Sequence, residues 1–266
     1  MRKMQSHKPL IIGIIPARMA STRFPGKPMA LINGIPMIGH VYFRSKTSKC
    51  LDEVYVATCD AEIYDYIISI GGQAVMTADT HERATDRTAE CLLKVEKKMK
   101  RKADIVVMIQ GDEPMIYPDM IDEAVLPLLS GKNVLVSNLM APLRNRDEHE
   151  DPNEVKVVVG LDGNALYFSR EPIPSWKKGA KNVRMLKQVC VIPFRRDFLI
   201  KFNSLPQTPL EKIESVDMLR VIENGFDVRM ILTKRNTYSV DTSEDLQDVS
   251  EEMLKDKLVK IYSRRH

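Results

Sequence analysis

The sequence predicts an α/β fold with a mostly parallel central sheet flanked by helices. Two observations carry this prediction. An apolar run near the N-terminus leads straight into a loop rich in proline and glycine, and strand-like and helix-like segments then alternate at short intervals. Such alternation is typical of right-handed βαβ units, whose strands are buried on both faces. The 266 residues are 44% hydrophobic and 29% charged, which is the composition of a globular protein.

The first half of the chain supplies the alternation. LIIGII at 10–15 is expected to be a buried strand, and the stretch at 16–28 is the loop that leaves it. Gly71 and Gly72 are expected to end a helix. The elements expected after the first strand are a helix at 37–46, a strand at 53–58, a helix at 61–70, a strand at 73–76, a helix at 86–102, a strand at 105–110 and a helix at 118–129.

Beyond about residue 130 the alternation loosens. Asp162-Gly163 readily supplies the positive φ of a tight turn, so 155–160 and 164–169 are expected to form a hairpin. Pro193 has no amide hydrogen, so its strand should lie at a sheet edge or an irregular point. The other elements expected here are a strand at 189–194, a helix from Pro209 that Asn224-Gly225 closes, a strand at 227–232 and a helix from Thr242.

Charge, cysteines and apolar runs exclude several classes. Forty Lys and Arg against 36 Asp and Glu leave a net charge of +4, too small an excess for a dedicated nucleic-acid binder. The four cysteines form no CxxC pair, so neither a disulfide framework nor a structural zinc site is expected. No run approaches the roughly 20 apolar residues of a membrane span. We therefore expect a cytoplasmic protein with no membrane span and no nucleic-acid partner.

The loop after the first strand concentrates positive charge. Arg18, Arg23 and Lys27 lie in it, with Gly26 beside the lysine. Ligands of parallel sheets bind at the carboxyl ends of strands, where a first βα loop can wrap phosphates. The loop matches neither GxxxxGK[ST] nor GxGxxG. We interpret it as a polyphosphate site; a Pro-Gly turn flanked by surface bases is the open alternative.

Two carboxylates are candidates for holding a divalent cation. Asp112 follows the strand at 105–110, and Asp241 precedes the last helix, where Thr242 is expected to be the N-cap with Asp245 as its return partner. Hard oxygen ligands suit Mg²⁺. With the cationic loop, the two aspartates form a minimum set for metal-assisted phosphoryl or nucleotidyl transfer. The alternative for Asp112 is a turn cap, and the sequence alone does not show that the carboxylates converge.

Nine motifs occur in order between about residues 10 and 255: PARMASTRFPGKP (16–28), NGIPMIGHV (33–41), TDRTAE (85–90), VMIQGDEP (107–114), PNEVKVV (152–158), ALYFSR (165–170), PLEKIE (209–214), LRVIENG (219–225) and VDTSEDL (240–246). Together they resemble the CMP-Kdo synthetases, the 3-deoxy-manno-octulosonate (Kdo) cytidylyltransferases. The resemblance implies a glycosyltransferase-A-like nucleotidyltransferase fold. It further implies a nucleotide-binding core over about 10–145 and 226–266, and a smaller mixed subdomain over about 150–225 that binds the sugar and dimerises.

The same resemblance implies an enzyme that transfers CMP from CTP to the anomeric hydroxyl of an acidic keto-sugar and releases pyrophosphate, for lipopolysaccharide or surface-polysaccharide synthesis. Mg²⁺ is the implied cofactor and a homodimer the implied assembly. Asp112 and Asp241 match the metal ligands, and with Arg18 and Lys27 they form the implied catalytic set. The residues that the resemblance implies for the nucleotide are Ala17, Arg18, Ser21, Lys27, Thr85, Arg87 and Gln110.

The sugar side departs from the family pattern. Gln188 and Ile192 stand where histidine and tyrosine are usual, Asp217-Met218 replaces Glu-Gln, and Arg83-Ala84 replaces Ser-Gly. A site built on polar partners discriminates strongly, so their loss predicts a different acid. Because Asp217 keeps an acidic acceptor, we expect a modified octulosonate such as an amino-substituted one. The residues expected on the sugar side are Arg23, Gln110, Arg170, Gln188, Ile192, Asp217 and Met218.

Three alternatives stay open. The departures could covary without changing the substrate. The chain could instead activate another ulosonic acid, such as a sialic-acid-like one, although such enzymes rarely combine the QGDEP and PLEKIE segments. A non-catalytic nucleotide-binding homologue is the third, and retention of Lys27, Asp112 and Asp241 argues against it because a binder would not need both metal carboxylates.

Overall fold

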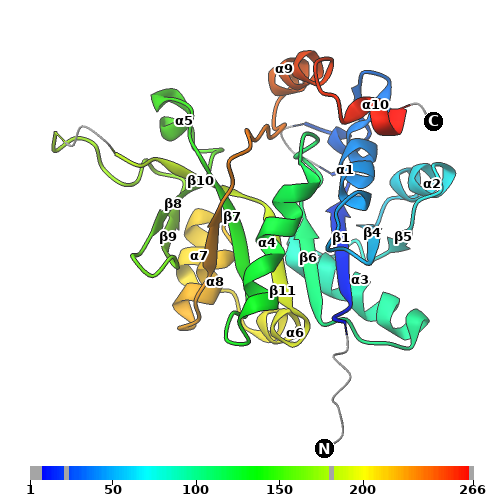
Figure 1. Cartoon of the computed structure of the whole chain (residues 1–266), viewed down its shortest axis with the longest axis horizontal. Helices are drawn as coiled ribbons and strands as arrows, with labels where there is room; N and C mark the ends of the chain where they lie inside the picture. Colours follow the sequence, from blue (N-terminus) through cyan, green and yellow to red (C-terminus); the bar gives the residue numbers. More distant parts are fainter. Residues whose placement is uncertain (1–7, 21–23, 180–182, 264–266) are drawn as a thin grey trace, which may run out of the picture.

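The computed structural model describes residues 8–20, 24–179 and 183–263, and two five-stranded sheets organise it (Figure 1). The first sheet has the order β11-β6-β1-β4-β5. Its strands are β1 (Ile11–Ala17), β4 (Glu53–Thr58), β5 (Ala74–Met76), β6 (Ile105–Ile109) and β11 (Val191–Arg195). β1, β4, β5 and β6 pair in parallel, and β11 pairs antiparallel with β6. The predicted α/β class with a mostly parallel central sheet is confirmed.

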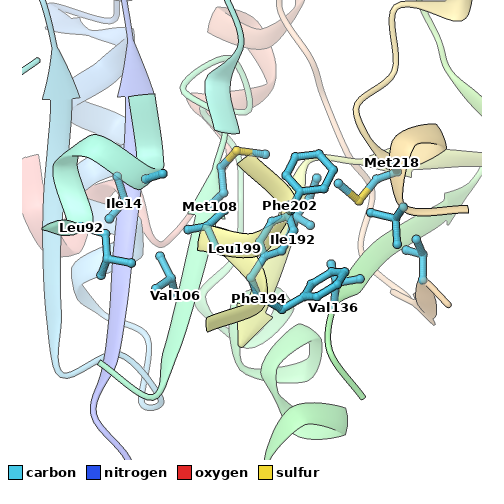
Figure 2. Packing of buried hydrophobic residues seen from close by; sticks show 14 of the residues in the cluster. Ile14, Leu92, Val106, Met108, Val136, Ile192, Phe194, Leu199, Phe202 and Met218 are labelled. Carbon is cyan, nitrogen blue, oxygen red and sulfur yellow. The ribbon is translucent and has the colours of Figure 1, made fainter. Parts of the chain in front are cut away.

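Helices cover both faces of this sheet, which explains the unbroken apolar runs of its strands. Alternate strand residues such as Ile14 and Val106 share one cluster with Leu92 and Phe202, from the helices on one face (Figure 2). The helices of that face are α3 (Ala84–Met99) and α6 (Arg196–Ser204); those of the other face are α1 (Met37–Lys46), α2 (Ala61–Ser69) and α4 (Pro118–Ser130). The helices expected at 37–46, 61–70, 86–102 and 118–129 are therefore confirmed within a few residues.

The second sheet has the order β12-β7-β10-β8-β9 and is mostly antiparallel. Its strands are β7 (Ser137–Pro142), β8 (Lys156–Val159), β9 (Ala165–Ser169), β10 (Leu186–Val189) and β12 (Arg229–Leu232). β8 and β9 form the predicted hairpin, with Gly163 at φ 83°. A bridge between Val136 and Phe194 joins the two sheets, which lie side by side in Figure 1.

Two predictions for the second half are wrong. The strand expected at 189–194 is two strands, β10 and β11, which belong to different sheets on either side of Cys190. The helix expected from Pro209 to Asn224 is broken into α7 (Pro209–Glu214) and α8 (Met218–Glu223), because Ser215 adopts the left-handed conformation. Pro193 does lie in an edge strand, as predicted.

The remaining elements are short: η1 (Lys27–Met29), β2 (Leu31–Ile32), β3 (Ile35–Pro36), α5 (Arg146–Glu150), α9 (Ser243–Met253) and α10 (Val259–Tyr262). A third apolar cluster joins α9 to the start of α1. The division into a core and a subdomain over 150–225 stays a prediction. The two sheets do not follow these bounds: β11, which lies within 150–225, belongs to the first sheet, and β7 and β12, which lie outside it, belong to the second. None of the helices that the structure describes has the length and apolar character of a membrane span.

Candidate active site between the two sheets

A cavity of about 500 Å³ lies where β1 and β6 end, opposite the junction of α7 and α8. This is the edge of a parallel sheet at which ligands bind. The predicted site residues that line it are Ala17, Arg18, Lys27, Arg87, Gln110, Asp112, Arg170, Gln188, Ile192, Asp217, Met218 and Asp241. Ser21 and Arg23 lie outside the described residues, and Thr85 is buried behind the wall. The fold therefore brings residues from both halves of the chain to one cavity.

The two predicted metal carboxylates converge on Lys27. Its Nζ lies 3.3 Å from Oδ2 of Asp112 and 3.4 Å from Oδ1 of Asp241, and donates to the carbonyl oxygen of Val240 at 2.8 Å. The backbone fixes this arrangement, because the N–H of Val240 donates to the carbonyl of Asp112 at 3.0 Å. A positive charge thus already lies between the two carboxylates.

The start of α9 sets the position of Asp241. Asp245 accepts hydrogen bonds from the N–H groups of Asp241 and Thr242, and its own N–H donates to Oγ1 of Thr242. This is the predicted N-cap with its return partner. The capping interactions use the backbone of Asp241 and leave its carboxylate directed at the cavity.

This donor set fits a divalent cation. Within the described ranges, no group of three or more His, Cys, Asp and Glu side chains is placed to hold a metal. Two carboxylates that need further oxygens from phosphate and water suit Mg²⁺, which keeps several waters and binds through one or two carboxylates together with substrate phosphates. The Lys27 ammonium lies against both carboxylates, so Asp112 and Asp241 present their charge to the same point.

Arg87 is a buried cation with an unused donor. Its Nη1 donates to Oγ1 of Thr77 at 2.5 Å and to the carbonyl of Ala78 at 3.2 Å. Its Nη2 is buried without a hydrogen-bond partner among the described residues. A buried polar group of this kind costs free energy unless a ligand satisfies it. The position of Arg87 in the cavity wall supports the predicted contact with the nucleotide.

On the sugar side, Arg170 is held rigidly by Glu214. The backbone N–H of Arg170 donates to Oε2 of Glu214 at 2.8 Å, and its Nε donates to the backbone carbonyl of Glu214 at 2.7 Å. Nη1 of Arg170 donates to the carbonyl of Pro152 at 2.8 Å. The fixed guanidinium lines the cavity. A planar guanidinium of this kind recognises a carboxylate well.

The residues that replace the family's histidine, tyrosine and glutamine do not present free polar groups. Nε2 of Gln188 donates to Oδ1 of Asn138 at 2.6 Å. Ile192 and Met218 are 2% and 0% exposed and pack with Met108 in the core (Figure 2). The structure therefore makes this part of the wall apolar, and Ile192 and Met218 can contact a sugar only through carbon and sulfur atoms.

Asp217 is not the free acid that the sequence suggested. Thr85 Oγ1 donates to its Oδ2 at 2.7 Å, and Nη1 of Arg83 lies 3.7 Å from its Oδ1. Burial raises the pKa of Asp217, and the hydrogen bond from Thr85 and the charge of Arg83 oppose that shift. Thr85, expected at the nucleotide, contacts the sugar-side acid through its side chain.

The cavity wall also contains residues that were not among the predicted site residues, among them Arg83, Glu113, Glu154, Cys190 and Ser215. Arg83 could have been found, because Arg83-Ala84 stands where the family pattern has Ser-Gly. Burial raises the pKa of Glu113 to about 8, although Lys187 opposes the shift. Burial and the nearby Asp112 raise the pKa of the Cys190 thiol. Ser215 had no sequence signal, since serine rarely adopts its left-handed conformation.

Comparisons with known proteins agree with this geometry. A family model described as Cytidylyltransferase matches residues 12–231. A 3-deoxy-manno-octulosonate cytidylyltransferase of Geobacter metallireducens is 42% identical over 253 residues, covering 91% of this chain and 97% of that protein. The Fusobacterium nucleatum protein of the same name is 41% identical over 238 residues, covering 90% of this chain and 94% of that protein.

Solved structures extend the agreement to three dimensions. A CMP:2-keto-3-deoxy-manno-octonic acid synthetase complexed with CTP matches with a TM-score of 0.84 at 38% identity, covering 92% of this chain and 99% of that chain. A cytidylyltransferase of Leptospira borgpetersenii, at 18% identity and a TM-score of 0.59, covers 96% of this chain and 94% of its own. That second likeness concerns the fold alone.

Proposed function

The chain belongs to the 3-deoxy-manno-octulosonate cytidylyltransferase family, and on that premise we propose that it transfers CMP from CTP to the anomeric hydroxyl of Kdo, with release of pyrophosphate. The product is an activated acid sugar of the kind used in lipopolysaccharide synthesis. One observation carries the proposal: the cationic loop, the Asp112–Asp241 pair and the fixed guanidinium of Arg170 all face one cavity.

The protein's part in the reaction is positioning and charge stabilisation. The anomeric oxygen forms a bond to the α-phosphorus of CTP and gives its proton to solvent, as the bond from that phosphorus to the bridging oxygen breaks and pyrophosphate leaves. Arg18 and Lys27 face the cavity where the triphosphate would lie, and hold the charge of the departing pyrophosphate. Since the sugar hydroxyl attacks phosphorus directly, no protein nucleophile is required.

The other cations of the cavity bind the rest of the two substrates. Nη2 of Arg87, which lacks a partner among the described residues, is satisfied by the nucleotide. Arg170 orients the sugar through its carboxylate. Mg²⁺ held by Asp112 and Asp241 would neutralise phosphate charge and increase the acidity of the sugar hydroxyl.

The proposal includes a homodimer formed through the second sheet. β9 is an edge strand of that sheet, and Leu166 on it is 62% exposed. Ile213 on the neighbouring α7 is 76% exposed. An open edge strand with exposed apolar side chains needs a cover in a stable protein.

Pyrophosphate release from CTP tests the function directly. The purified protein with Mg²⁺ would be assayed with Kdo, a sialic-acid-like nonulosonate and no acceptor. Release with Kdo alone is expected. Release only with the nonulosonate would establish another ulosonic-acid cytidylyltransferase, and release with neither acid would overturn the proposed transfer to Kdo.

A further inference from the structure

Arg83 and Asp217 come from segments far apart in the chain and lie side by side in the cavity wall. Arg83 precedes α3, and Asp217 lies at the start of α8. Nη1 of Arg83 lies 3.7 Å from Oδ1 of Asp217 and donates to Oγ of Ser215 at 3.0 Å. All three residues line the cavity. The two departures from the family pattern that carry charge are therefore neighbours.

Both groups keep unused hydrogen-bonding capacity toward the cavity. The 3.7 Å separation is too long for a hydrogen bond. In the described part of the chain, Oδ1 of Asp217 accepts no hydrogen bond, whereas Oδ2 accepts one from Thr85. The Arg83 side chain is 20% exposed and donates one hydrogen bond to a described residue, of the five that a guanidinium can make. A ligand can thus donate to Asp217 and accept from Arg83 at once.

The adjacent acid, Glu211, also lies beside Arg83, with its Oε1 4.0 Å from Nε of Arg83, but its charge is already balanced by Arg220. Glu211 is fully buried and receives Nη2 and Nε of Arg220 at 2.5 and 2.7 Å. The nearest guanidinium to Asp217 is that of Arg83, which leaves the corner close to electrically neutral.

We propose that Arg83 and Asp217 are a specificity-determining pair that reads the hydroxylated tail of the sugar acid and selects a neutral tail over an amino-substituted one. A hydroxyl both donates and accepts, so it satisfies both partners. An ammonium group would be attracted by Asp217 but repelled by the Arg83 guanidinium a few ångströms away. This inference rests on the proposed transfer to a 3-deoxy-octulosonate, and it reverses the sequence expectation of an amino sugar.

The test compares kcat/KM for Kdo with that for a Kdo analogue carrying an amino group in place of the terminal hydroxyl. Wild-type protein is expected to prefer Kdo at least tenfold. Arg83→Gln should shift the ratio at least tenfold toward the amino analogue, mainly through KM, because Asp217 is then no longer neutralised. The conservative Arg83→Lys should keep the wild-type ratio.

Two further variants separate the pair from general electrostatics. When Arg83→Gln is combined with Asp217→Asn, the kcat/KM ratio should no longer shift toward the amino analogue, since no carboxylate remains at 217 to attract the ammonium group. Asp79→Asn removes a charge from the same loop, at an exposed position that does not line the cavity, and should leave the ratio within twofold. Thermal melting of each variant checks that it is folded.

The outcomes distinguish the two proposals. A ratio unchanged by Arg83→Gln, an equal shift with Asp79→Asn, or a wild-type preference for the amino analogue overturns the pair while turnover itself persists. Absence of pyrophosphate release with either sugar overturns the proposed function and the pair together.

Discussion

At the scale of single residues, charge balance around Asp112 and Asp241 decides what the site can do. The two carboxylates share one ammonium, that of Lys27, at 3.3 and 3.4 Å. Both carboxylates lie next to the cationic loop and are partly exposed to the cavity. Neutralising either one should remove much of the affinity for a divalent cation.

We expect Asp112→Asn and Asp241→Asn each to lower kcat by about 10²-fold or more, because each removes half of the charge that holds the cation. The variants should melt within a few degrees of wild type, since Lys27 keeps one carboxylate partner. Pyrophosphate release at saturating Mg²⁺ measures the loss, with the exposed Asp227→Asn as control. Turnover equal to wild type in either site variant would refute the role.

His40 is a residue whose protonation should control stability. It is fully buried; Nδ1 lies 2.8 Å from Oη of Tyr262, and Nε2 lies 2.9 Å from the carbonyl of Ile32. Nε of Arg44 donates to the same Tyr262 oxygen at 3.1 Å. Burial lowers the pKa of His40 to about 4.

Because the pKa of His40 is depressed in the folded state, the unfolded chain binds more protons between about pH 6.5 and pH 4. Stability therefore falls as the pH is lowered through that window, by about 2 kcal/mol between pH 7 and pH 5. Urea unfolding of wild type and His40→Gln at both pH values measures this. The free energy of unfolding of His40→Gln should fall by about 2 kcal/mol less than that of wild type between pH 7 and pH 5. An identical pH dependence in the two proteins would exclude His40 as the cause.

At the scale of elements, the sequence predicted a helix end correctly where the turn needs a glycine. Gly71 adopts φ 71° after α2, and the N–H of Gly72 donates to the carbonyl of Ile67 at 2.8 Å. The predicted end of this helix is confirmed for the reason given, a conformation that suits glycine.

Gly72 has a further constraint that the sequence did not show. A Cβ at this position would lie 2.8 Å from the carbonyl oxygen of Ile67 and 2.7 Å from its side chain. Gly72→Ala should therefore lower the free energy of unfolding by about 1–3 kcal/mol, the usual cost of overpacking. Gly131→Ala, whose nearest contacts are at 3.5 Å, is the matched control in urea titrations and should change stability much less.

Local signals failed where distant contacts decided. Apolar residues run through 189–194 with no turn residue at Cys190, yet β10 pairs with β7 while β11 pairs with β6. Likewise, residues 209–224 read as one helix, but the buried Glu211–Arg220 pair joins two short ones across the break at Ser215. Pairing partners far along the chain set these boundaries, and no local propensity encodes them.

At the scale of the whole molecule, the second sheet presents an apolar edge at β9 and α7. We expect light scattering to give twice the chain mass of 30.3 kDa for wild type. Leu166→Arg combined with Ile213→Arg should give the monomer mass, because it places two charges in the proposed interface.

The matched control is Leu254→Arg, at a site beyond α9 that is 69% exposed. It should remain dimeric. A wild-type monomer, or a dimer that survives the paired substitution, would contradict the interface.

The sequence by itself determined the fold class and the family, and it singled out the cationic loop and the two aspartates, whose roles stay predictions. These rest on short motifs and on local periodicity, which are written in consecutive residues. Gln110, Asp112 and Asp241 could be named because each follows a strand or precedes a helix with clear signals. The roles of Ser21 and Arg23 stay predictions.

Only the tertiary structure decided how these residues meet. It placed Lys27 between Asp112 and Asp241, buried Ile192 and Met218 in an apolar wall, and set Arg83 beside Asp217. Each of these contacts joins segments that are distant in the chain. Packing and charge interactions depend on distance in space, which the order of residues does not give. The sequence therefore shows an acid at 217, but only the tertiary structure shows that Thr85 and Arg83 are the groups beside it.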